Sequence, residues 1–162
     1  KLNVREEKIS ELVEGLCMEW EADIFESGKQ FDYEMTRGLL YVCDWERIRQ
    51  MLTELLDNAV KYTPSGGTIR LILNRDRKQH LRIVVSNEGE EITEKDLEKI
   101  FDRFYRVDPS RARETGGYGL GLCVAKCIAQ LHGGTITAES GNGINVFTVV
   151  LGDVANARGG DR

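Results

Sequence analysis

The sequence predicts an α+β protein in which one mixed β-sheet carries its main helices on one face. Three segments repeat apolar residues at the helical period of about 3.6, and several shorter runs alternate apolar and polar residues as strands do. The segments do not follow the regular strand–helix–strand order of a parallel sheet, and no internal repeat is visible. At 162 residues the chain is long enough for one buried core and short for two.

The first half of the chain starts with an expected amphipathic helix over residues 5–26, which Gly28 ends. Short strands are expected over 31–35 and 39–43. A second helix follows, with Asp44 as its N-cap, and Pro64 and a glycine pair end it near Tyr62. The next two strands are expected over residues 68–74 and 81–86, where Ile, Leu and Val alternate with polar residues.

The second half continues with a short helix over residues 93–100, capped by Thr93. Residues 101–118 are polar, basic and rich in glycine at their end, which predicts a mobile loop. A third long helix is expected over 119–131. Two strands, 135–140 and 145–151, are joined by Gly141-Asn142-Gly143, which is typical of a tight hairpin. The tail, residues 153–162, has no periodicity and is expected to be disordered.

Composition argues against two classes of protein. The net charge of −5 is the wrong sign for a typical nucleic-acid binder. The longest apolar runs are about five residues, against the roughly 20 that a membrane-spanning helix needs, and no signal peptide precedes the first helix. We therefore expect this chain to contact neither nucleic acid nor a membrane.

The four cysteines lack the spacing of a metal site, and only two histidines, His80 and His132, accompany them. The expected role of all four is that of small buried hydrophobic residues in a reducing compartment. Two of them, Cys123 and Cys127, are four residues apart and so share a helix face.

Glu54, Asn58 and Lys61 lie at i, i+4 and i+7 of the second helix, within about 60° of one another around its axis. Carboxylate and amide oxygens are the ligands of hard cations such as Mg²⁺, and substrate phosphates can complete the coordination. A solvated helix face with ordinary side-chain pairing would give the same pattern. The stripe alone leaves both interpretations open.

Four glycines, at 116, 117, 119 and 121, stand directly before the third long helix. The first turn of a helix has free backbone N–H groups and a partial positive charge, and glycine lets a phosphate reach them. The spacing matches neither the P-loop nor, clearly, the dinucleotide-binding pattern. The loop is therefore a candidate polyphosphate site, although a glycine-rich loop is weak evidence by itself.

Five segments in order make the interpretation specific: "ELLDNAVKYT", "VVSNEGEEI", "IFDRFYRVD", "GGYGLGL" and "HGGTI". The set resembles the N, G1, F, G2 and G3 regions of the catalytic ATP-binding domain of sensor histidine kinases, of the family shared with gyrase, Hsp90 and MutL. The resemblance covers residues 1 to about 152 and implies the Bergerat-type α/β sandwich with three main helices on one face of the sheet. The segment Phe101 to Arg106 points to histidine kinases rather than to the other branches.

The resemblance also implies site residues. Asn58 would coordinate the Mg²⁺ bound to ATP, and Glu54, where many histidine kinases carry Asn and the hydrolytic relatives carry a catalytic Glu, would order water or the metal. Asn87 would accept a hydrogen bond from the adenine amino group, and Gly89 would let the base approach. Further nucleotide contacts are implied for Lys61, Tyr62, Ile92, Phe104, Arg106, Gly117, Tyr118, Gly119, Leu120, Gly121 and Leu122. Residues 102–115 would form the lid.

Two positions depart from the family pattern. Asn87 stands where Asp is usual, so a neutral amide oxygen replaces a carboxylate as the acceptor. Glu91 replaces the second glycine of the DxGxG pattern, which adds a side chain beside the base. Both departures bear on nucleotide affinity more than on the fold. The phenylalanines Phe101 and Phe104 are expected to pack in the core, to anchor the lid, or both.

The resemblance implies a protein-histidine kinase fragment that binds ATP and Mg²⁺ and transfers the γ-phosphoryl group to a histidine. Neither His80 nor His132 has the surroundings of an acceptor helix, so the acceptor is expected on a separate dimerisation domain of the full-length kinase. A response regulator would act downstream, and the domain would be cytoplasmic in a membrane-anchored protein. The alternatives are a nucleotide-binding regulatory module without phosphotransfer, or an anti-sigma serine kinase of the same fold.

Overall fold

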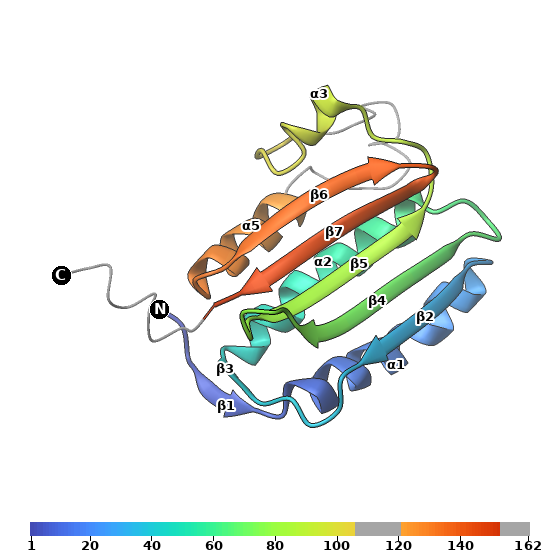
Figure 1. The fold of residues 1–162 in the computed structure, drawn as a ribbon. Coiled ribbons are helices and arrows are strands. Elements are labelled where there is room, and N and C mark those ends of the chain that lie inside the picture. The colour runs from blue at the N-terminus through green and yellow to red at the C-terminus, as the bar shows by residue number, and fades with distance from the viewer. Residues whose placement is uncertain (106–120, 153–162) are drawn as a thin grey trace.

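The computed structural model describes residues 1–105 and 121–152. Its helices are α1 (Ile9–Glu26), α2 (Trp45–Tyr62), α3 (Glu94–Leu97) and α5 (Gly121–Leu131). Its strands are β1 (Arg5–Glu7), β2 (Gln30–Met35), β3 (Tyr41–Cys43), β4 (Thr68–Arg75), β5 (Leu81–Glu88), β6 (Thr135–Gly141) and β7 (Ile144–Leu151). Figure 1 shows the five longer strands as one sheet with the long helices behind it.

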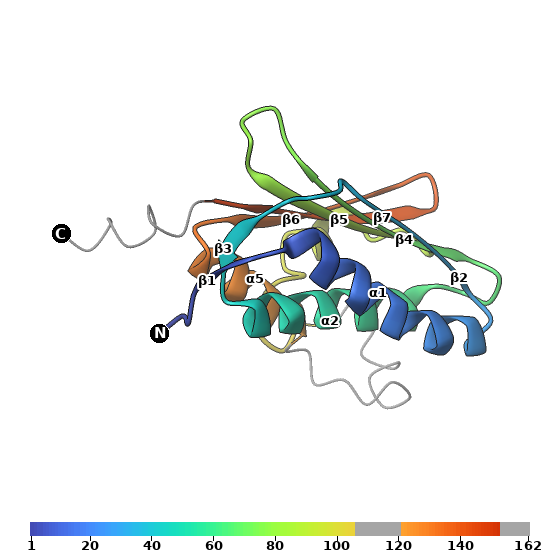
Figure 2. The same cartoon turned by 90° about the horizontal axis from the view of Figure 1, so that it is seen from below.

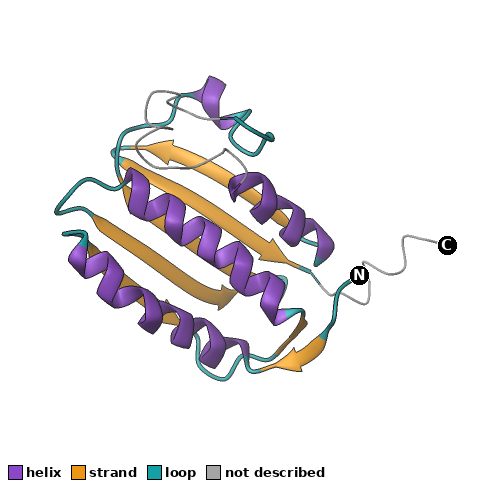
Figure 3. Cartoon of the chain, turned by 180° about the vertical axis from the view of Figure 1, so that it is seen from behind, coloured by secondary structure: helices purple, strands orange, loops and turns teal. Residues whose placement is uncertain are grey.

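The main sheet has the strand order β2-β4-β5-β7-β6. The β2–β4 pair is parallel and every other neighbouring pair is antiparallel, so the sheet is mixed as the sequence predicts. Figures 2 and 3 show α1, α2 and α5 side by side on the same face of this sheet. The predicted α+β sandwich with three main helices on one face is therefore confirmed.

The core lies between the sheet and the three long helices, of which α2 is the middle one (Figure 3). The strand residues that face α2 are almost wholly apolar and buried, which follows from the two-residue alternation in the sequence. Burial of one such side chain contributes about 1.5–3 kcal/mol. The buried residues of α2 are Ile48, Met51, Leu52, Leu55, Leu56 and Ala59.

Local signals place several boundaries correctly. The Asp44 side chain accepts a hydrogen bond from Arg47 N and caps α2. The Thr93 side chain accepts one from Asp96 N and caps α3. Asn142 and Gly143 have φ of 55° and 76°, as a tight hairpin turn between β6 and β7 requires. These capping and turn predictions are confirmed because each depends on residues only a few positions apart.

Three predicted boundaries were wrong. Residues 5–7 form β1, which pairs with β3 in a separate two-stranded sheet, and α1 starts only at Ile9. The strand expected over 39–43 covers only Tyr41–Cys43, and α3 stops at Leu97 rather than at residue 100. The β1–β3 pairing joins backbone groups that are far apart in sequence, so the helical period over residues 5–26 gave no sign of it.

The expectation that all four cysteines are buried was also wrong. Cys17 and Cys43 are buried, but Cys123 is half-buried and Cys127 is exposed. α5 buries Ala125, Ile128 and Ala129, which leaves Cys127 on the solvent side of the helix. Among the described residues, no helix is both long enough and apolar enough to cross a membrane.

Candidate functional site: the interface of α2, α5 and the loop after β5

The structure brings the polar stripe of α2 against the first residue of α5. Glu54 and Asn58 are half-buried on α2, and α5 packs beside that helix (Figure 3). A Cβ added at Gly121 would lie 2.6 Å from Glu54 Oε2. The carboxylate therefore stands directly beside the point where the glycine-rich segment enters its helix. Two features that are more than 60 residues apart in sequence meet at one place.

The charges on this stripe interact with one another. Burial raises the pKa of Glu54, the neighbouring Asp57 carboxylate raises it further, and Lys61 opposes the shift. Lys61 Nζ lies 3.1 Å from Asp57 Oδ2, an i, i+4 ion pair on α2. Lys61 is thus held at the stripe by Asp57, a residue that the sequence prediction omitted although its i, i+4 spacing to Lys61 was visible.

The loop after β5 lies against the C-terminal end of α2. A Cβ at Gly89 would lie 2.7 Å from Tyr62 O and 3.1 Å from Asn87 Nδ2. Because the Tyr62 contact is with backbone, only glycine fits there. Asn87 itself is 3% exposed, and its Nδ2 donates to Glu88 O at 3.2 Å. Tyr62, Asn87 and Gly89 are therefore brought together as the resemblance implies.

Three further predicted residues lie in the described part of the chain. Ile92 and Leu122 are half-buried and pack against the core. Phe104 is 63% exposed, with φ of 65° and the Arg103 guanidinium carbon 5.5 Å from its ring centroid. Core packing is thus wrong for Phe104. It is confirmed for Phe101, which meets Phe147 edge-on with the ring centroids 6.3 Å apart.

The remaining predicted site residues lie outside the described residues. They are Arg106, Gly117, Tyr118, Gly119 and Leu120, together with most of the predicted lid over 102–115.

Sequence reasoning missed a polar network next to the Asn87 loop. Asn145, on β7, is 3% exposed and donates through Nδ2 to Glu90 O at 3.0 Å. Its Oδ1 accepts from Ser140 Oγ at 2.5 Å. The signal was present: Asn145 occupies an inward position of a strand whose later inward residues, Phe147, Val149 and Leu151, are all apolar. A buried amide in such a series needs partners, and this one has them.

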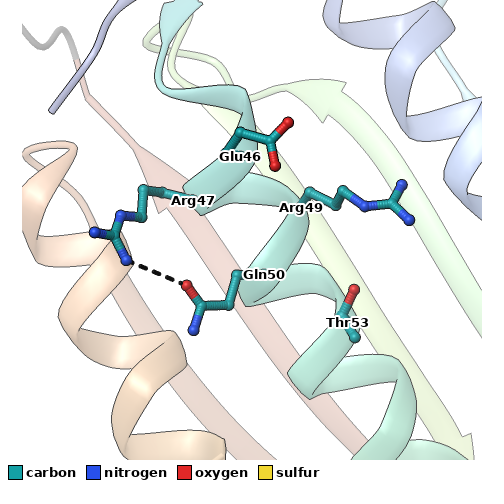
Figure 4. A pocket seen from close by; sticks show the side chains of 5 residues that line it. All are labelled: Glu46, Arg47, Arg49, Gln50 and Thr53. Atoms are coloured by element: carbon teal, nitrogen blue, oxygen red, sulfur yellow. Dashed lines mark hydrogen bonds between the residues drawn. The ribbon is translucent and has the colours of Figure 1, made fainter.

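The first half of α2 lines a separate depression, on the helix face turned away from the sheet (Figure 4). Arg47 donates to Gln50 Oε1 at 3.4 Å, and Arg49 forms an ion pair with Glu19 of α1 at 2.8 Å. The other lining residues are Glu46 and Thr53. None of the predicted site residues is among them, so this depression is distinct from the candidate nucleotide site.

The donor set at the α2–α5 contact suits a magnesium ion that is held jointly with phosphate. In residues 1–105 and 121–152, no group of three or more His, Cys, Asp or Glu side chains is arranged to hold a metal. Glu54 and Asn58 supply one carboxylate and one amide oxygen. Mg²⁺ is commonly bound by one or two protein oxygens with waters and substrate phosphates completing its octahedron. The residues present therefore fit Mg²⁺ that arrives with a nucleotide.

Comparisons with known proteins identify the family of the chain. Residues 43–153 match the family described as histidine kinase-, DNA gyrase B-, and HSP90-like ATPase. The chain is 45% identical over 124 residues to the sensor histidine kinase WalK of Bacillus subtilis (strain 168), covering 73% of this chain and 20% of WalK. It is 41% identical over 105 residues to the sensor histidine kinase CusS of Escherichia coli (strain K12), covering 64% of this chain and 22% of CusS.

The fold also matches a solved structure along its whole length. The catalytic domain of histidine kinase ThkA, in a nucleotide-free form, superposes with a TM-score of 0.83 at 28% identity, covering 97% of this chain and 100% of that domain. The chain spans only about a fifth of the length of WalK and CusS, so it corresponds to one part of such proteins. The matched residues and the shared fold show that the chain belongs to the histidine kinase-, DNA gyrase B- and HSP90-like ATPase family.

Proposed function

We propose that residues 1–152 are the catalytic ATP-binding domain of a sensor histidine kinase. The domain binds ATP with Mg²⁺ and delivers the γ-phosphoryl group to a histidine on a separate dimerisation domain. The contact between Glu54 and Gly121 carries the proposal, because it joins the oxygen-bearing stripe of α2 to the start of the helix that follows the glycines. The sensor histidine kinases among the relatives support the same conclusion.

At the phosphate end of the site, polar and charged side chains and backbone N–H groups bind the phosphates. Asn58 contributes its amide oxygen to Mg²⁺, which when bound neutralises phosphate charge. The Glu54 carboxylate accepts a hydrogen bond from a water beside the phosphates or orders the ion. The half-buried Lys61, whose ammonium group is paired with Asp57, belongs to the same stripe, and we assign it a contact with the phosphates. We assign the remaining phosphate contacts to Arg106 and to the backbone N–H groups of Gly117, Gly119 and Gly121.

The base end uses the loop after β5. The Asn87 amide nitrogen is engaged by Glu88 O, so the oxygen is the end left to accept from the adenine amino group. Gly89 keeps the loop close to Tyr62, which packs on the adenine. We assign further contacts with the nucleotide to Ile92, Phe104, Tyr118, Leu120 and Leu122.

Neither histidine of this chain suits the role of acceptor. His132 is fully buried: its Nε2 accepts from Asp44 N at 3.2 Å, and its Nδ1 donates to Ile128 O at 2.9 Å. His80 lies in the β4–β5 turn with Nδ1 3.4 Å from Asp76 Oδ2. The phosphoryl group therefore goes to a histidine on another domain, and from there to a response regulator. The full-length protein is proposed to be membrane-anchored, with this domain on the cytoplasmic side.

A regulatory module that binds nucleotide without phosphotransfer is the second candidate, and the neutral Asn87 favours it. Glu91, the other departure from the family pattern, is exposed, which leaves it free to point away from the base. Incubation of the chain with ATP and a histidine-bearing helical domain separates the two functions. Phosphohistidine on the helical domain is expected, and binding without transfer would favour the regulatory module.

The metal site is tested by replacing Asn58 with alanine. Loss of a ligand to a charged group costs about 1.5–3 kcal/mol, so Asn58→Ala should weaken Mg–ATP binding about tenfold to a hundredfold in calorimetry. The weakening should vanish when Mg²⁺ is chelated. Gln50→Ala, an exposed position on the same helix, is the control and should bind as the parent does. Equal Mg–ATP affinity in a folded Asn58→Ala variant would contradict the assignment.

A further inference from the structure

A buried amide and a hydroxyl connect the loop after β5 to the β6–β7 hairpin. Ile92 N donates to Ser140 Oγ at 2.8 Å, and Ser140 Oγ donates to Asn145 Oδ1 at 2.5 Å. Asn145 Nδ2 then donates back to Glu90 O at 3.0 Å. The relay thus begins and ends on the same loop, two residues apart, and passes through two strands.

The position of Asn145 in the sheet explains how its side chain can bond both to Ser140 and to the loop after β5. In the strand registers, Asn145 is the direct partner of Ser140 on β6 and of Asn87 on β5. Asn145 is 3% exposed, so its amide group has little access to water and depends on these protein partners. A fourth bond, from Gly89 N to Gly143 O at 2.9 Å, fixes the loop to the tip of the same hairpin. The loop is therefore held at residues 89, 90 and 92 by the β6–β7 hairpin.

We propose that Ser140 and Asn145 are positioning residues that set the loop of residues 89–92, and with it the base-binding end of the nucleotide site. The inference rests on the proposed function, because it takes Asn87, Gly89 and Ile92 as the residues that meet the base. Neither Ser140 nor Asn145 is assigned a contact with the nucleotide. They act by satisfying Ile92 N and Glu90 O in one loop conformation, which lowers the conformational cost of binding.

Removal of either side chain breaks two of the three hydrogen bonds of the relay and so loosens the loop. Ser140→Ala and Asn145→Ala should each weaken Mg–ATP binding about threefold to tenfold. Mg–GTP carries the same phosphates on another base, so its affinity should change less, and the ATP-to-GTP affinity ratio should fall. The double variant should lose no more than the more severe single variant, because both break one relay.

Matched variants separate positioning from a loss of stability. Ser140→Thr keeps the hydroxyl group and should restore the parental ATP-to-GTP ratio. Thr137→Ala, at an exposed position of the same strand, should leave the ratio and the exchange of the Ile92 amide hydrogen unchanged. In Ser140→Ala that amide should exchange faster, because its acceptor is gone.

The outcomes are distinguishable. If the parent chain binds neither nucleotide, the proposed function fails and the inference fails with it. If the parent binds Mg–ATP but Ser140→Ala keeps the parental ratio, the positioning role alone is overturned. Lower melting temperatures with an unchanged ratio would likewise overturn it, because they would show that the relay serves only the fold. Should Asn145→Ala not fold, Ser140→Ala and Ser140→Thr decide the question.

Discussion

Asn87 is a buried residue at the end of β5, and its side chain is neutral. It lies at the base end of the candidate site. Its nitrogen is used by Glu88 O, and its neighbour Gly89 is fixed against Tyr62 O. The amide is thus oriented by its immediate surroundings before any ligand arrives. A substitution at Asn87 should therefore change the strength of one hydrogen bond rather than the shape of the loop.

Asn87→Asp should strengthen adenine nucleotide binding several-fold. A hydrogen bond to a carboxylate is worth about 1.5–3 kcal/mol, against about 0.5–1.5 kcal/mol for a neutral acceptor. Desolvation of the new charge offsets part of this gain, as does its repulsion with Glu88 O. Titration with Mg–ATP and Mg–GTP measures the effect, which should favour ATP because guanine has a carbonyl where adenine has its amino group.

Asn142→Asp introduces the same charge at the exposed hairpin turn and serves as the control. It should leave both affinities near those of the parent. A weaker affinity for ATP in Asn87→Asp, or an equal gain for GTP, would mean that Asn87 does not face the base.

At the scale of elements, His132 joins α5 to α2. It follows α5, and its ring connects Ile128 O of that helix to the backbone N–H of Asp44, the N-cap of α2. Asp44 Oδ2 in turn accepts from Asn3 N, so the chain before β1 meets the same point. The N-terminal end of α2 is therefore joined to the C-terminal end of α5. This junction helps to set the relative placement of the two helices, on which the Glu54–Gly121 contact depends.

This junction should lose stability in acid. Burial lowers the pKa of His132 below its ordinary value of 6.5, although the hydrogen bond to Ile128 O and the Asp44 charge oppose the shift. The unfolded state then binds more protons, so the stabilisation is complete above pH 6.5 and is lost as the pH falls through 6.5 toward the folded pKa. For one group, the free energy of unfolding can fall by up to about 1.4 kcal/mol per pH unit.

Urea unfolding at pH 7.5 and 5.5 measures this loss. The parent should lose more free energy of unfolding between these pH values than His132→Gln, which cannot titrate at that position. Gln130→Ala, which changes an exposed and uncharged residue of α5, should keep the parental loss. An identical pH dependence in the parent and in His132→Gln would assign the acid sensitivity to other groups.

At the scale of the whole molecule, the reactivity of the cysteines depends on how far each is buried in the core. Cys17 of α1 and Cys43 of β3 come from different elements but are both completely buried in the one core cluster. Burial raises the pKa of each thiol to about 12, which suppresses the reactive thiolate as well as access to it. Cys127 is exposed on α5 and Cys123 is half-buried.

An alkylating reagent should therefore modify Cys127 fast and Cys123 more slowly in the native protein. Cys17 and Cys43 should react only at the unfolding transition, both at the same urea concentration, because one cooperative core protects them. Mass spectrometry of the peptides gives the rates, and Cys127→Ser should remove the fast phase. Native-state modification of Cys17 would show that α1 opens independently of the sheet.

Features that depend on neighbouring residues could be predicted from the sequence. The apolar periods predicted α2, α5 and the strands of the main sheet, and single side chains predicted the caps at Asp44 and Thr93. The ordered motifs identified the family and marked Glu54, Asn58, Asn87 and the glycines as candidate site residues. These signals are readable because a cap, a turn or a helical face is encoded within a few positions.

Contacts between groups far apart in sequence could not be predicted from local patterns. The β1–β3 pairing, the exposure of Cys127 and Phe104, and the approach of Glu54 to Gly121 depend on how the elements pack. The relay through Asn145 and Ser140 connects residues separated by 48 and 55 positions. A local pattern shows that a buried Asn needs partners, but its partners are chosen by the strand registers, which hydrogen bonds and core packing across the whole sheet set together.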